Sequence, residues 1–300
     1  MNHWKPTETY RKIAEANRTY YSQTAGLYDA TETCVQDEEV QGQLEADIDR
    51  VLGALNKPVR EVSALDACGG SGNISMKLLR RGVNVVLADI SPQLLELFEK
   101  KAAAAGYPAK SVCSEVATFL GDSVRAFDLI VFSSALHHLE NIDGVLGLAY
   151  QRLAPGGLLF TVFDPTAQSQ RKLATRMLLK LDYYWFKLVC QSSDVLPAAG
   201  RRFRRLLSGS TPDRKDQVAL NQSTVGMLAE YHVERGIDDL GLVERLKGVG
   251  YEVVWHERYA KCRANWMLPL VQFLGDKTSF KLLLRKPHAM CTPQCLMSKY

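Results

Sequence analysis

The stretch LDACGGSGN, residues 65–73, decides the fold. It places an acidic residue, a cysteine and three glycines within nine positions, directly after an apolar-leaning run. Glycine loses more backbone freedom on folding than any other residue, so such a cluster is retained where the chain must turn sharply or approach another group closely. We therefore expect a tight turn here, between the end of a strand and the start of a helix.

The residues around this turn alternate between short β-rich runs and helical patterns, which is typical of a mostly parallel sheet with helices on both faces. The predicted strands are 61–66, 83–89, 109–113, 127–133 and 156–163, and the predicted helices are 73–81, 91–105 and 141–153. The alternation stops after residue 163 and resumes with a helix at 237–250 and strands at 251–259 and 279–287. Residues 154–157 (APGG) are predicted to form the turn before the fifth strand.

These patterns divide the chain into five segments. An N-terminal helical segment (1–57) contains a helix predicted over 35–55, because apolar residues recur there at helical spacing. The sheet core is predicted over 58–164 and again over 236–287, separated by a helical insertion at 165–235 and followed by a tail at 288–300. A connection as long as 165–235 is rarely plain loop, so we expect it to be a helical cap.

The turn lies where open α/β sheets bind ligands, in the crevice outside the carboxyl ends of the strands. Two nucleotide-binding patterns do not fit it. The dinucleotide fingerprint G-x-G-x-x-G begins with Gly70 and Gly72 but meets Ser75 at its third position, which disfavours a nicotinamide-dependent oxidoreductase. A P-loop needs Gly-Lys-Ser/Thr, which is absent.

LDACGGSGN instead resembles the first motif, D-x-G-x-G-x-G, of class I S-adenosylmethionine-dependent methyltransferases. Asp66, Gly70 and Gly72 match it, while Cys68 stands where the first glycine usually is. Because a side chain disfavours positive φ, we expect Cys68 to keep a negative φ. The later segments VVLADIS, FDLIVFSSALHHL, LAPGGLLFTVFDP and FKLLLRKP resemble further motifs of the family in the same order, with the His-His pair of its ubiquinone-biosynthesis-like, small-molecule branch.

The resemblance implies an α/β fold, a Rossmann-like seven-stranded sheet with its last strand antiparallel, helices on both faces and a helical cap insertion. It implies S-adenosyl-L-methionine as cofactor and S-adenosyl-L-homocysteine as product. Asp89 is expected to accept the ribose hydroxyls, and the aromatic segment containing Tyr20 is expected to cover the cofactor or to pack on the core. The residues predicted to bind the cofactor are Tyr21, Tyr28, Asp66, Ala67, Cys68, Gly69, Gly70, Gly72, Asn73, Asp89, Ile90, Ser114, Glu115, Ser133 and His138.

Methyl transfer needs a general base only when the acceptor is a hydroxyl or a protonated amine, and histidine is the first candidate for that role. His138, His137 and His232 are the predicted candidates, with structural roles as the alternative. Asp164, predicted just past the fifth strand, either faces the acceptor or caps the insertion. No metal site is expected, since His288, Cys291 and Cys295 in the tail make a poor zinc site.

The insertion concentrates positive charge, with nine Lys or Arg residues and two Asp between residues 171 and 205 in a chain whose net charge is +4. Residues 171–190 combine a basic row (Lys172, Arg176, Lys180) with an apolar stripe that begins Leu173, Met177, Leu181. Three interpretations stay open: the stripe packs on the core, the helix caps a pocket for an apolar or anionic acceptor, or the helix contacts a membrane surface.

The sequence thus predicts an S-adenosylmethionine-dependent methyltransferase acting on an O or N atom of a small molecule, with amphiphilic or anionic molecules as candidate acceptors. The alternatives are methylation of a quinone or lipid at a membrane surface, and a non-catalytic protein that binds the cofactor as a regulatory subunit or scaffold. Nucleic acid is a disfavoured partner because the chain outside 171–205 is net acidic. Seven scattered cysteines and the lack of a signal-like N-terminus favour free thiols and a cytoplasmic protein.

Overall fold

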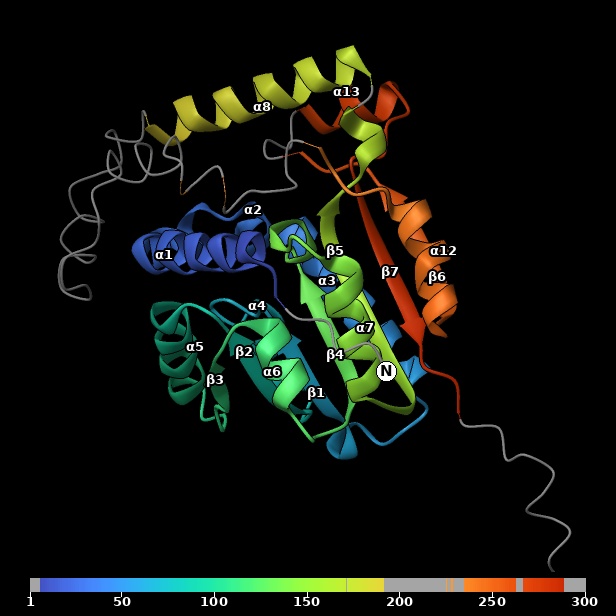
Figure 1. The fold of residues 1–300 in the computed structure, drawn as a ribbon. Coiled ribbons are helices and arrows are strands. Elements are labelled where there is room, and N and C mark those ends of the chain that lie inside the picture. The colour runs from blue at the N-terminus through green and yellow to red at the C-terminus, as the bar shows by residue number, and fades with distance from the viewer. Residues whose placement is uncertain are drawn as a thin grey trace, which may run out of the picture.

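The computed structural model describes residues 6–170, 172–191, 225, 228, 235–262 and 267–288. They form a seven-stranded sheet with the strand order β3-β2-β1-β4-β5-β7-β6 (Figure 1). The strands are β1 (Ser63–Ala67), β2 (Asn84–Asp89), β3 (Ser111–Cys113), β4 (Phe127–Ser133), β5 (Leu153–Pro165), β6 (Glu252–Tyr259) and β7 (Ser279–Arg285). Strands β1 to β5 pair in parallel, while β7 runs antiparallel to both β5 and β6. The predicted fold class is confirmed.

Helices cover both faces of this sheet. Their bounds are α1 (Glu8–Thr31), α2 (Thr33–Gln36), α3 (Glu38–Ala54), α4 (Asn73–Arg80), α5 (Pro92–Ala104), α6 (Val116–Asp122), α7 (Ile142–Arg152), α8 (Leu173–Gln191), α12 (Asp239–Val249) and α13 (Leu268–Phe273), with short 3-10 turns at Val59–Glu61, Leu136–His138 and Ala167–Gln170. Buried side chains of α6, α7 and α12 form one apolar cluster with the sheet. Those of α3, α4 and α5 form a second cluster on the opposite face.

The structure corrects several predicted boundaries. The helix expected over 35–55 is two helices, because the side chain of Asp37 accepts a hydrogen bond from the Val40 N–H and so caps a new helix, α3. Residues 154–157 lie within β5 rather than in a turn before it, and the β4–β5 register shifts between Phe127 and Leu129 to accommodate them. Two short helices, α6 and α13, were not predicted.

The topology places one crevice at the carboxyl end of the sheet. From β1 the chain passes through α4 to β2 on one side, whereas β4 pairs with β1 on the other. Such a reversal of strand order leaves a crevice outside the strand ends, where ligands of open α/β sheets bind. The turn at 65–73 therefore lies at the edge of this crevice, as the sequence predicts.

A buried ion pair fastens α3 to the antiparallel end of the sheet. Lys281 Nζ on β7 lies 3.0 Å from both carboxylate oxygens of Asp47, and both side chains are about 6% exposed. Beside them, the Arg50 guanidinium lies 3.8 Å from the centroid of a Trp255 ring. Lys281 Nζ also lies 3.4 Å from the half-exposed Glu257 carboxylate, so Asp47 is its buried partner and Glu257 a second partner nearer the surface. Removing Asp47 would leave a buried ammonium with the longer, more solvated pair only.

We predict that Asp47→Ala lowers the free energy of unfolding by about 3 kcal/mol, at the low end for a broken buried ion pair, since it leaves the buried Lys281 ammonium with only the half-exposed Glu257 carboxylate, 3.4 Å away. Urea denaturation measures this change. Replacing both residues, as in Asp47→Leu with Lys281→Met, should recover most of the loss. The exposed pair Lys100–Glu96 is the control, and Lys100→Ala should cost no more than about 0.5 kcal/mol. Equal effects at the two sites would contradict the prediction.

Candidate functional site

The turn after β1 adopts a backbone conformation that side chains rarely allow. Cys68, Gly70 and Gly72 have φ values of 55°, 55° and 85°. The expectation of a negative φ at Cys68 is therefore wrong. The turn requires the left-handed conformation at position 68 whatever residue stands there, and the chain tolerates the strain, which is about 1–2 kcal/mol for a non-glycine residue.

Asp66 fixes where this turn ends and α4 begins. Its Oδ2 accepts hydrogen bonds from the Ser75 N–H at 2.9 Å and the Ser75 hydroxyl at 2.7 Å. The carboxyl group is fully buried, and burial raises its pKa to about 7. Asp66 thus stabilises the first turn of α4 through Ser75, and it is not among the lining residues of the pocket.

Asp89, at the end of β2, joins the same turn to the neighbouring strand. One carboxylate oxygen accepts the Gly70 N–H and the other accepts the Ser91 N–H, both at 2.8 Å. Burial is the largest cause raising the pKa of this carboxyl. The backbone of Ile90 bonds this carboxylate as well. Because a carboxylate offers about four acceptor positions, capacity for a further donor remains.

The three glycines of the turn serve different purposes. A Cβ on Gly69 would lie 2.7 Å from the Asp66 carboxyl carbon, and one on Gly72 would lie 2.3 Å from the Phe98 ring, so these two leave room for the protein itself. A Cβ on Gly70 would instead point toward Tyr28 and meet its hydroxyl at 3.4 Å. Of the three, Gly70 alone lines the pocket.

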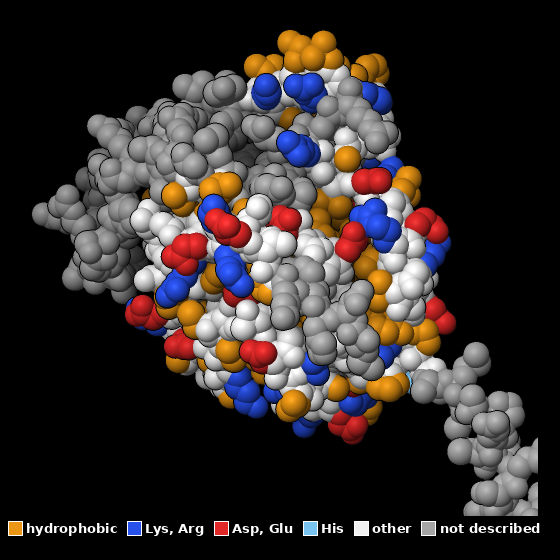
Figure 2. All heavy atoms as spheres, in the orientation of Figure 1, with side chains coloured by type: hydrophobic (Ala, Val, Ile, Leu, Met, Phe, Trp, Pro, Cys, Tyr) orange, Lys and Arg blue, Asp and Glu red, His pale blue; other side chains and the backbone are white. Residues whose placement is uncertain are grey.

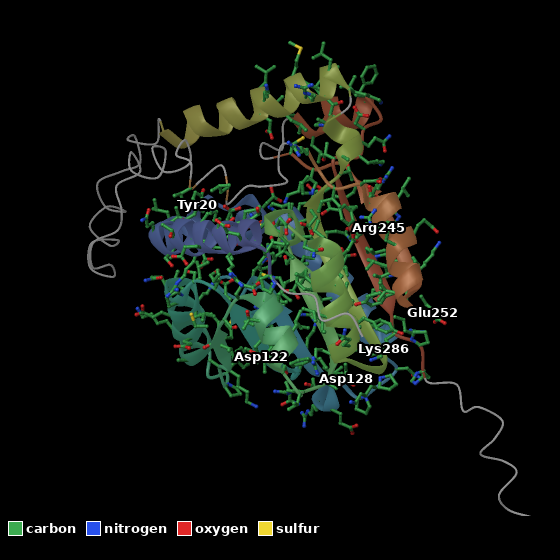
Figure 3. The ribbon with its side chains drawn as sticks, in the orientation of Figure 1. Tyr20, Asp122, Asp128, Arg245, Glu252 and Lys286 are labelled. Atoms are coloured by element: carbon green, nitrogen blue, oxygen red, sulfur yellow. The ribbon has the colours of Figure 1, made fainter. Side chains whose placement is uncertain are left out.

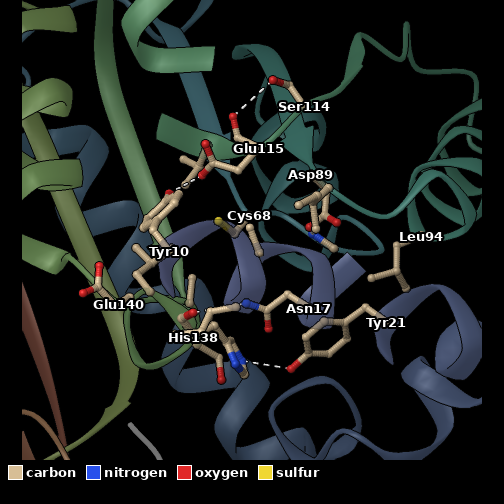
Figure 4. A pocket seen from close by; sticks show the side chains of 18 of the residues that line it. Tyr10, Asn17, Tyr21, Cys68, Asp89, Leu94, Ser114, Glu115, His138 and Glu140 are labelled. Atoms are coloured by element: carbon tan, nitrogen blue, oxygen red, sulfur yellow. Dashed lines mark hydrogen bonds between the residues drawn. The ribbon is translucent and has the colours of Figure 1, made fainter. Parts of the chain in front are cut away.

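That pocket has a volume of about 680 Å³, which includes space open to solvent, and lies between the turn, the ends of β2 and β4, and helix α1 (Figure 4). Its lining consists of Tyr10, Ile13, Ala14, Asn17, Tyr21, Tyr28, Cys68, Gly70, Asp89, Ile90, Leu94, Ser114, Glu115, Val116, Ser134, Ala135, His138, Leu139 and Glu140. The turn, two strand ends and one helix therefore contribute side chains to a single site.

Helix α1 closes the pocket on the side away from the sheet. The residues it contributes recur at positions 10, 13, 14, 17, 21 and 28, the spacing of one helix face. Its contacts reach three parts of the core: the Tyr10 hydroxyl bonds Glu115, Ser22 Oγ lies 3.2 Å from Ser91 Oγ, and Asp29 pairs with Lys101 at 2.9 Å.

A tyrosine–histidine pair spans the pocket between α1 and the end of β4. The Tyr21 hydroxyl lies 2.9 Å from His138 Nε2, as the dashed line in Figure 4 marks. Asn17 Nδ2 donates to the His138 carbonyl oxygen at 3.1 Å, so α1 positions both the backbone and the ring of this histidine.

His137 and Asp164 support this pair from behind. The centroid of the His137 ring lies 3.9 Å from that of His138, and Asp164 Oδ1 lies 2.8 Å from His137 Nδ1 and accepts the His137 N–H at 3.1 Å. The Thr161 hydroxyl donates to the other carboxylate oxygen. Asp164 is a residue of β5 with no exposed surface, so it faces His137 rather than an acceptor.

The pocket brings together nine of the predicted cofactor-binding positions. These are Tyr21, Tyr28, Cys68, Gly70, Asp89, Ile90, Ser114, Glu115 and His138. The structure places the other six outside the lining: Asp66, Ala67, Gly69, Gly72, Asn73 and Ser133. Of the catalytic candidates, His138 lines the pocket, His137 and Asp164 do not, and His232 lies outside the described residues, as do Cys291 and Cys295 of the tail.

Tyr10 and Asn17 also line the pocket, although they were not predicted to do so. Tyr10 lies 7 residues before Asn17 and 11 before Tyr21, and Asn17 lies 11 before Tyr28, which are spacings of one helix face, so the periodicity of α1 could have indicated them. Ser134, rather than the predicted Ser133, faces the pocket because β4 ends at Ser133 and the chain then takes a φ of 53° at Ser134.

Comparison with known proteins identifies the sheet core. A family model described as "Methyltransferase domain" matches residues 65–159. A tRNA 5-carboxymethoxyuridine methyltransferase from Escherichia coli is 32% identical over 128 residues, covering 41% of this chain and 47% of that protein. A ubiquinone/menaquinone biosynthesis C-methyltransferase from Zymomonas mobilis is 31% identical over 106 residues, covering 35% and 44%. This chain therefore spans less than half the length of these relatives.

Residues 65–159 form a methyltransferase domain, with the motifs of the class I S-adenosylmethionine-dependent enzymes. The fold agrees over a longer range, since the magnesium protoporphyrin IX methyltransferase of Synechocystis PCC 6803 with bound S-adenosylhomocysteine superposes with a TM-score of 0.56 at 13% identity. That superposition covers 91% of this chain and 99% of the other. The resemblance inferred from the motifs, and with it the predicted cofactor, is confirmed.

The pocket offers groups of the kind that this cofactor requires. Gly70 leaves space for a ligand to approach the backbone, which a Cβ would take up, and the Asp89 carboxylate keeps capacity to accept from a ribose hydroxyl. Tyr21 and Tyr28 of α1 are lining residues of the same pocket, and an aromatic face stabilises a cation such as a sulfonium. These are the residues that would hold the cofactor in this pocket.

We predict that Asp66→Asn changes how the stability of the domain depends on pH. A carboxyl whose pKa is higher in the folded than in the unfolded chain binds more protons when the chain is folded. The contribution of Asp66 to the free energy of unfolding is therefore complete below about pH 4 and is lost as the pH rises to about 7. The free energy of unfolding of Asp66→Asn, minus that of the wild type, should therefore increase between these pH values.

Urea denaturation at a series of pH values measures this difference. Asp49→Asn is the control, because Asp49 is exposed and its hydrogen bond to Arg81 lowers its pKa, which moves its titration to more acidic pH. A difference for Asp66→Asn that stays flat across the range, like that expected for Asp49→Asn, would contradict the assignment of a raised pKa.

Proposed function

We propose that this protein transfers a methyl group from S-adenosylmethionine to an O or N atom of a small-molecule acceptor. The observation that carries the proposal is that the Tyr21–His138 pair and the cradle of Gly70 and Asp89 line one pocket. When bound, the cofactor supplies a methyl group on a sulfonium, which is already activated for in-line displacement. The chain must mainly align the reactants, and such positioning can lower the activation free energy by about 7–11 kcal/mol.

His138 and Tyr21 would accept and relay the proton of a hydroxyl or ammonium acceptor. His138 is the one histidine among the described lining residues, and the Tyr21 hydroxyl is within hydrogen-bond distance of its Nε2. Asn17 contributes a further acceptor, because its buried Oδ1 has no hydrogen-bond partner among the described residues. A donor group of the acceptor molecule could therefore bond Asn17 while its reacting atom faces His138.

The charges along the pocket bear on the acceptor class. The described lining residues include Asp89, Glu115 and Glu140, and no Lys or Arg. Glu115 is occupied by the N–H groups of Ala117 and Thr118 at the start of α6 and by Tyr10. This lining supports a neutral or cationic acceptor over an anionic one. The two relatives are named for different acceptors, a tRNA nucleoside and a quinone, so neither name decides the acceptor of this protein.

We predict that Gly70→Ala weakens S-adenosylhomocysteine binding at least tenfold. The new methyl group would be directed at Tyr28, and its backbone would have to keep a positive φ. Gly106→Ala is the matched control, because Gly106 also has a positive φ, of 73°, but nothing lies within 4 Å of an added Cβ. Isothermal titration calorimetry measures both. If the two variants bound S-adenosylhomocysteine with equal affinity, the prediction that the glycine turn contributes to cofactor binding would be wrong.

We predict that His138→Ala and Tyr21→Phe lower kcat, by about 100-fold or more for His138→Ala, while S-adenosylhomocysteine affinity changes less than threefold. The assay is transfer of labelled methyl from S-adenosylmethionine to fractionated small-molecule extracts, followed by kinetics with the acceptor it reveals. Tyr107→Phe, a half-buried tyrosine outside the pocket, is the control.

Two results would overturn parts of this proposal. If kcat were unchanged in both pocket variants, the Tyr21–His138 pair would take no part in methyl transfer. Tight cofactor binding without transfer to any fraction would favour the alternative of a non-catalytic protein that binds S-adenosylmethionine.

A further inference from the structure

Helix α8 exposes its apolar residues instead of burying them. Leu173, Met177 and Leu181 are 69%, 58% and 58% exposed, so the interpretation that this stripe packs on the core is wrong for its first half. The fully buried side chains of this half of α8 are polar, since Thr175 bonds Asp276 and Asp182 is buried as well, while Leu178 and Leu179 are half-buried. An apolar row facing solvent while polar groups face the protein indicates that the row has another partner.

The exposed side of α8 carries two parallel rows. At about 100° per residue, Lys172, Arg176 and Lys180 occupy roughly 80° of the helix surface, and Leu173, Met177 and Leu181 occupy the next 80° or so. All three basic residues are exposed, and over residues 172–182 the only acidic side chain, Asp182, is buried. This is the pattern of a helix that lies in a membrane interface, with apolar residues inserted and basic residues beside them.

Helix α13 extends the same surface. Lys172 Nζ lies 2.6 Å from an Asp276 carboxylate oxygen and bonds the Leu274 carbonyl oxygen at 3.4 Å, so the start of α8 is fixed beside the end of α13. On α13, Phe273 is 89% exposed and Leu270 is exposed too. Figure 2 shows hydrophobic side chains along the upper edge of the molecule with Lys and Arg directly below them, where Figure 1 places α8 and α13.

We propose that this α8–α13 surface docks on an anionic lipid membrane. It comprises the apolar side chains Leu173, Met177, Leu181, Leu270 and Phe273 and the basic side chains Lys172, Arg176 and Lys180. No helix among the described residues could span a bilayer, so the contact is peripheral. Charge favours a membrane as the occupant, because anionic headgroups complement the whole basic row, whereas a two-fold contact with a second copy in antiparallel orientation would place two basic rows side by side.

The inference is independent of methyl transfer, because the surface is separate from the pocket residues. Each basic residue close to an anionic surface contributes roughly a fivefold gain in binding, and the inserted apolar side chains add to it. Binding should therefore need both rows, and it should weaken as salt screens the basic row.

Co-sedimentation of the full chain with vesicles tests the proposal. We expect binding to vesicles of mixed phosphatidylcholine and phosphatidylglycerol and at least tenfold weaker binding to phosphatidylcholine alone. Arg176→Glu with Lys180→Glu should reduce binding to the mixed vesicles at least tenfold, and Met177→Ser with Leu181→Ser and Phe273→Ser should do the same. These residues are exposed, and thermal unfolding together with S-adenosylhomocysteine binding checks that each variant is folded.

Lys100→Glu with Val124→Ser is the matched control. Lys100 and Val124 are exposed, Val124 at 98%, and Asp122 near Val124 is labelled in Figure 3 at the end of the molecule opposite α8. This variant should bind the mixed vesicles like the wild type. The proposal is overturned if neither vesicle binds, if the control loses binding equally, or if the apolar variants instead convert a dimer to a monomer in sedimentation analysis. Salt-sensitive binding to RNA without vesicle binding would overturn it as well.

Discussion

The site depends on one carboxylate that joins two strands. Asp89 accepts the N–H groups of Gly70 and Ser91, so the turn after β1 and the start of α5 are held at fixed distances from the end of β2. Asp66 then fixes the start of α4 on the other side of the turn. With both carboxylates in place, the left-handed backbone at Cys68 and Gly70 is retained, and the crevice at the switch of strand order becomes a pocket with defined walls.

The sheet was predictable from the sequence because its central strands are buried on both faces and therefore appear as continuous apolar runs. Residues 127–133 and the neighbouring runs show this clearly, and the glycine turn marks where the first of them ends. The boundaries that failed were decided by single side chains or by pairing across the sheet. Asp37 divides the predicted 35–55 helix, and pairing with β4 draws residues 154–157 into β5.

The pocket was predictable only in part, for a related reason. Motif residues on the sheet side, such as Gly70 and Asp89, follow from the order of strands and turns. The wall formed by α1 does not, because which face of a helix meets the sheet depends on tertiary contacts such as those of Tyr10 and Asp29. The same limit applies to α8, where amphipathic spacing identified two rows but could not decide that the apolar row is the exposed one.

Cys68 has a chemical consequence for a domain of this kind. Burial, followed by the charges of Asp89 and Glu115, raises the pKa of its thiol well above the usual value, so the sulfur stays protonated at neutral pH. Only a thiolate is a strong nucleophile, and S-adenosylmethionine is an alkylating agent. The acidic, enclosed surroundings of Cys68 therefore disfavour the thiolate, which is the form of the sulfur that an alkylating agent attacks.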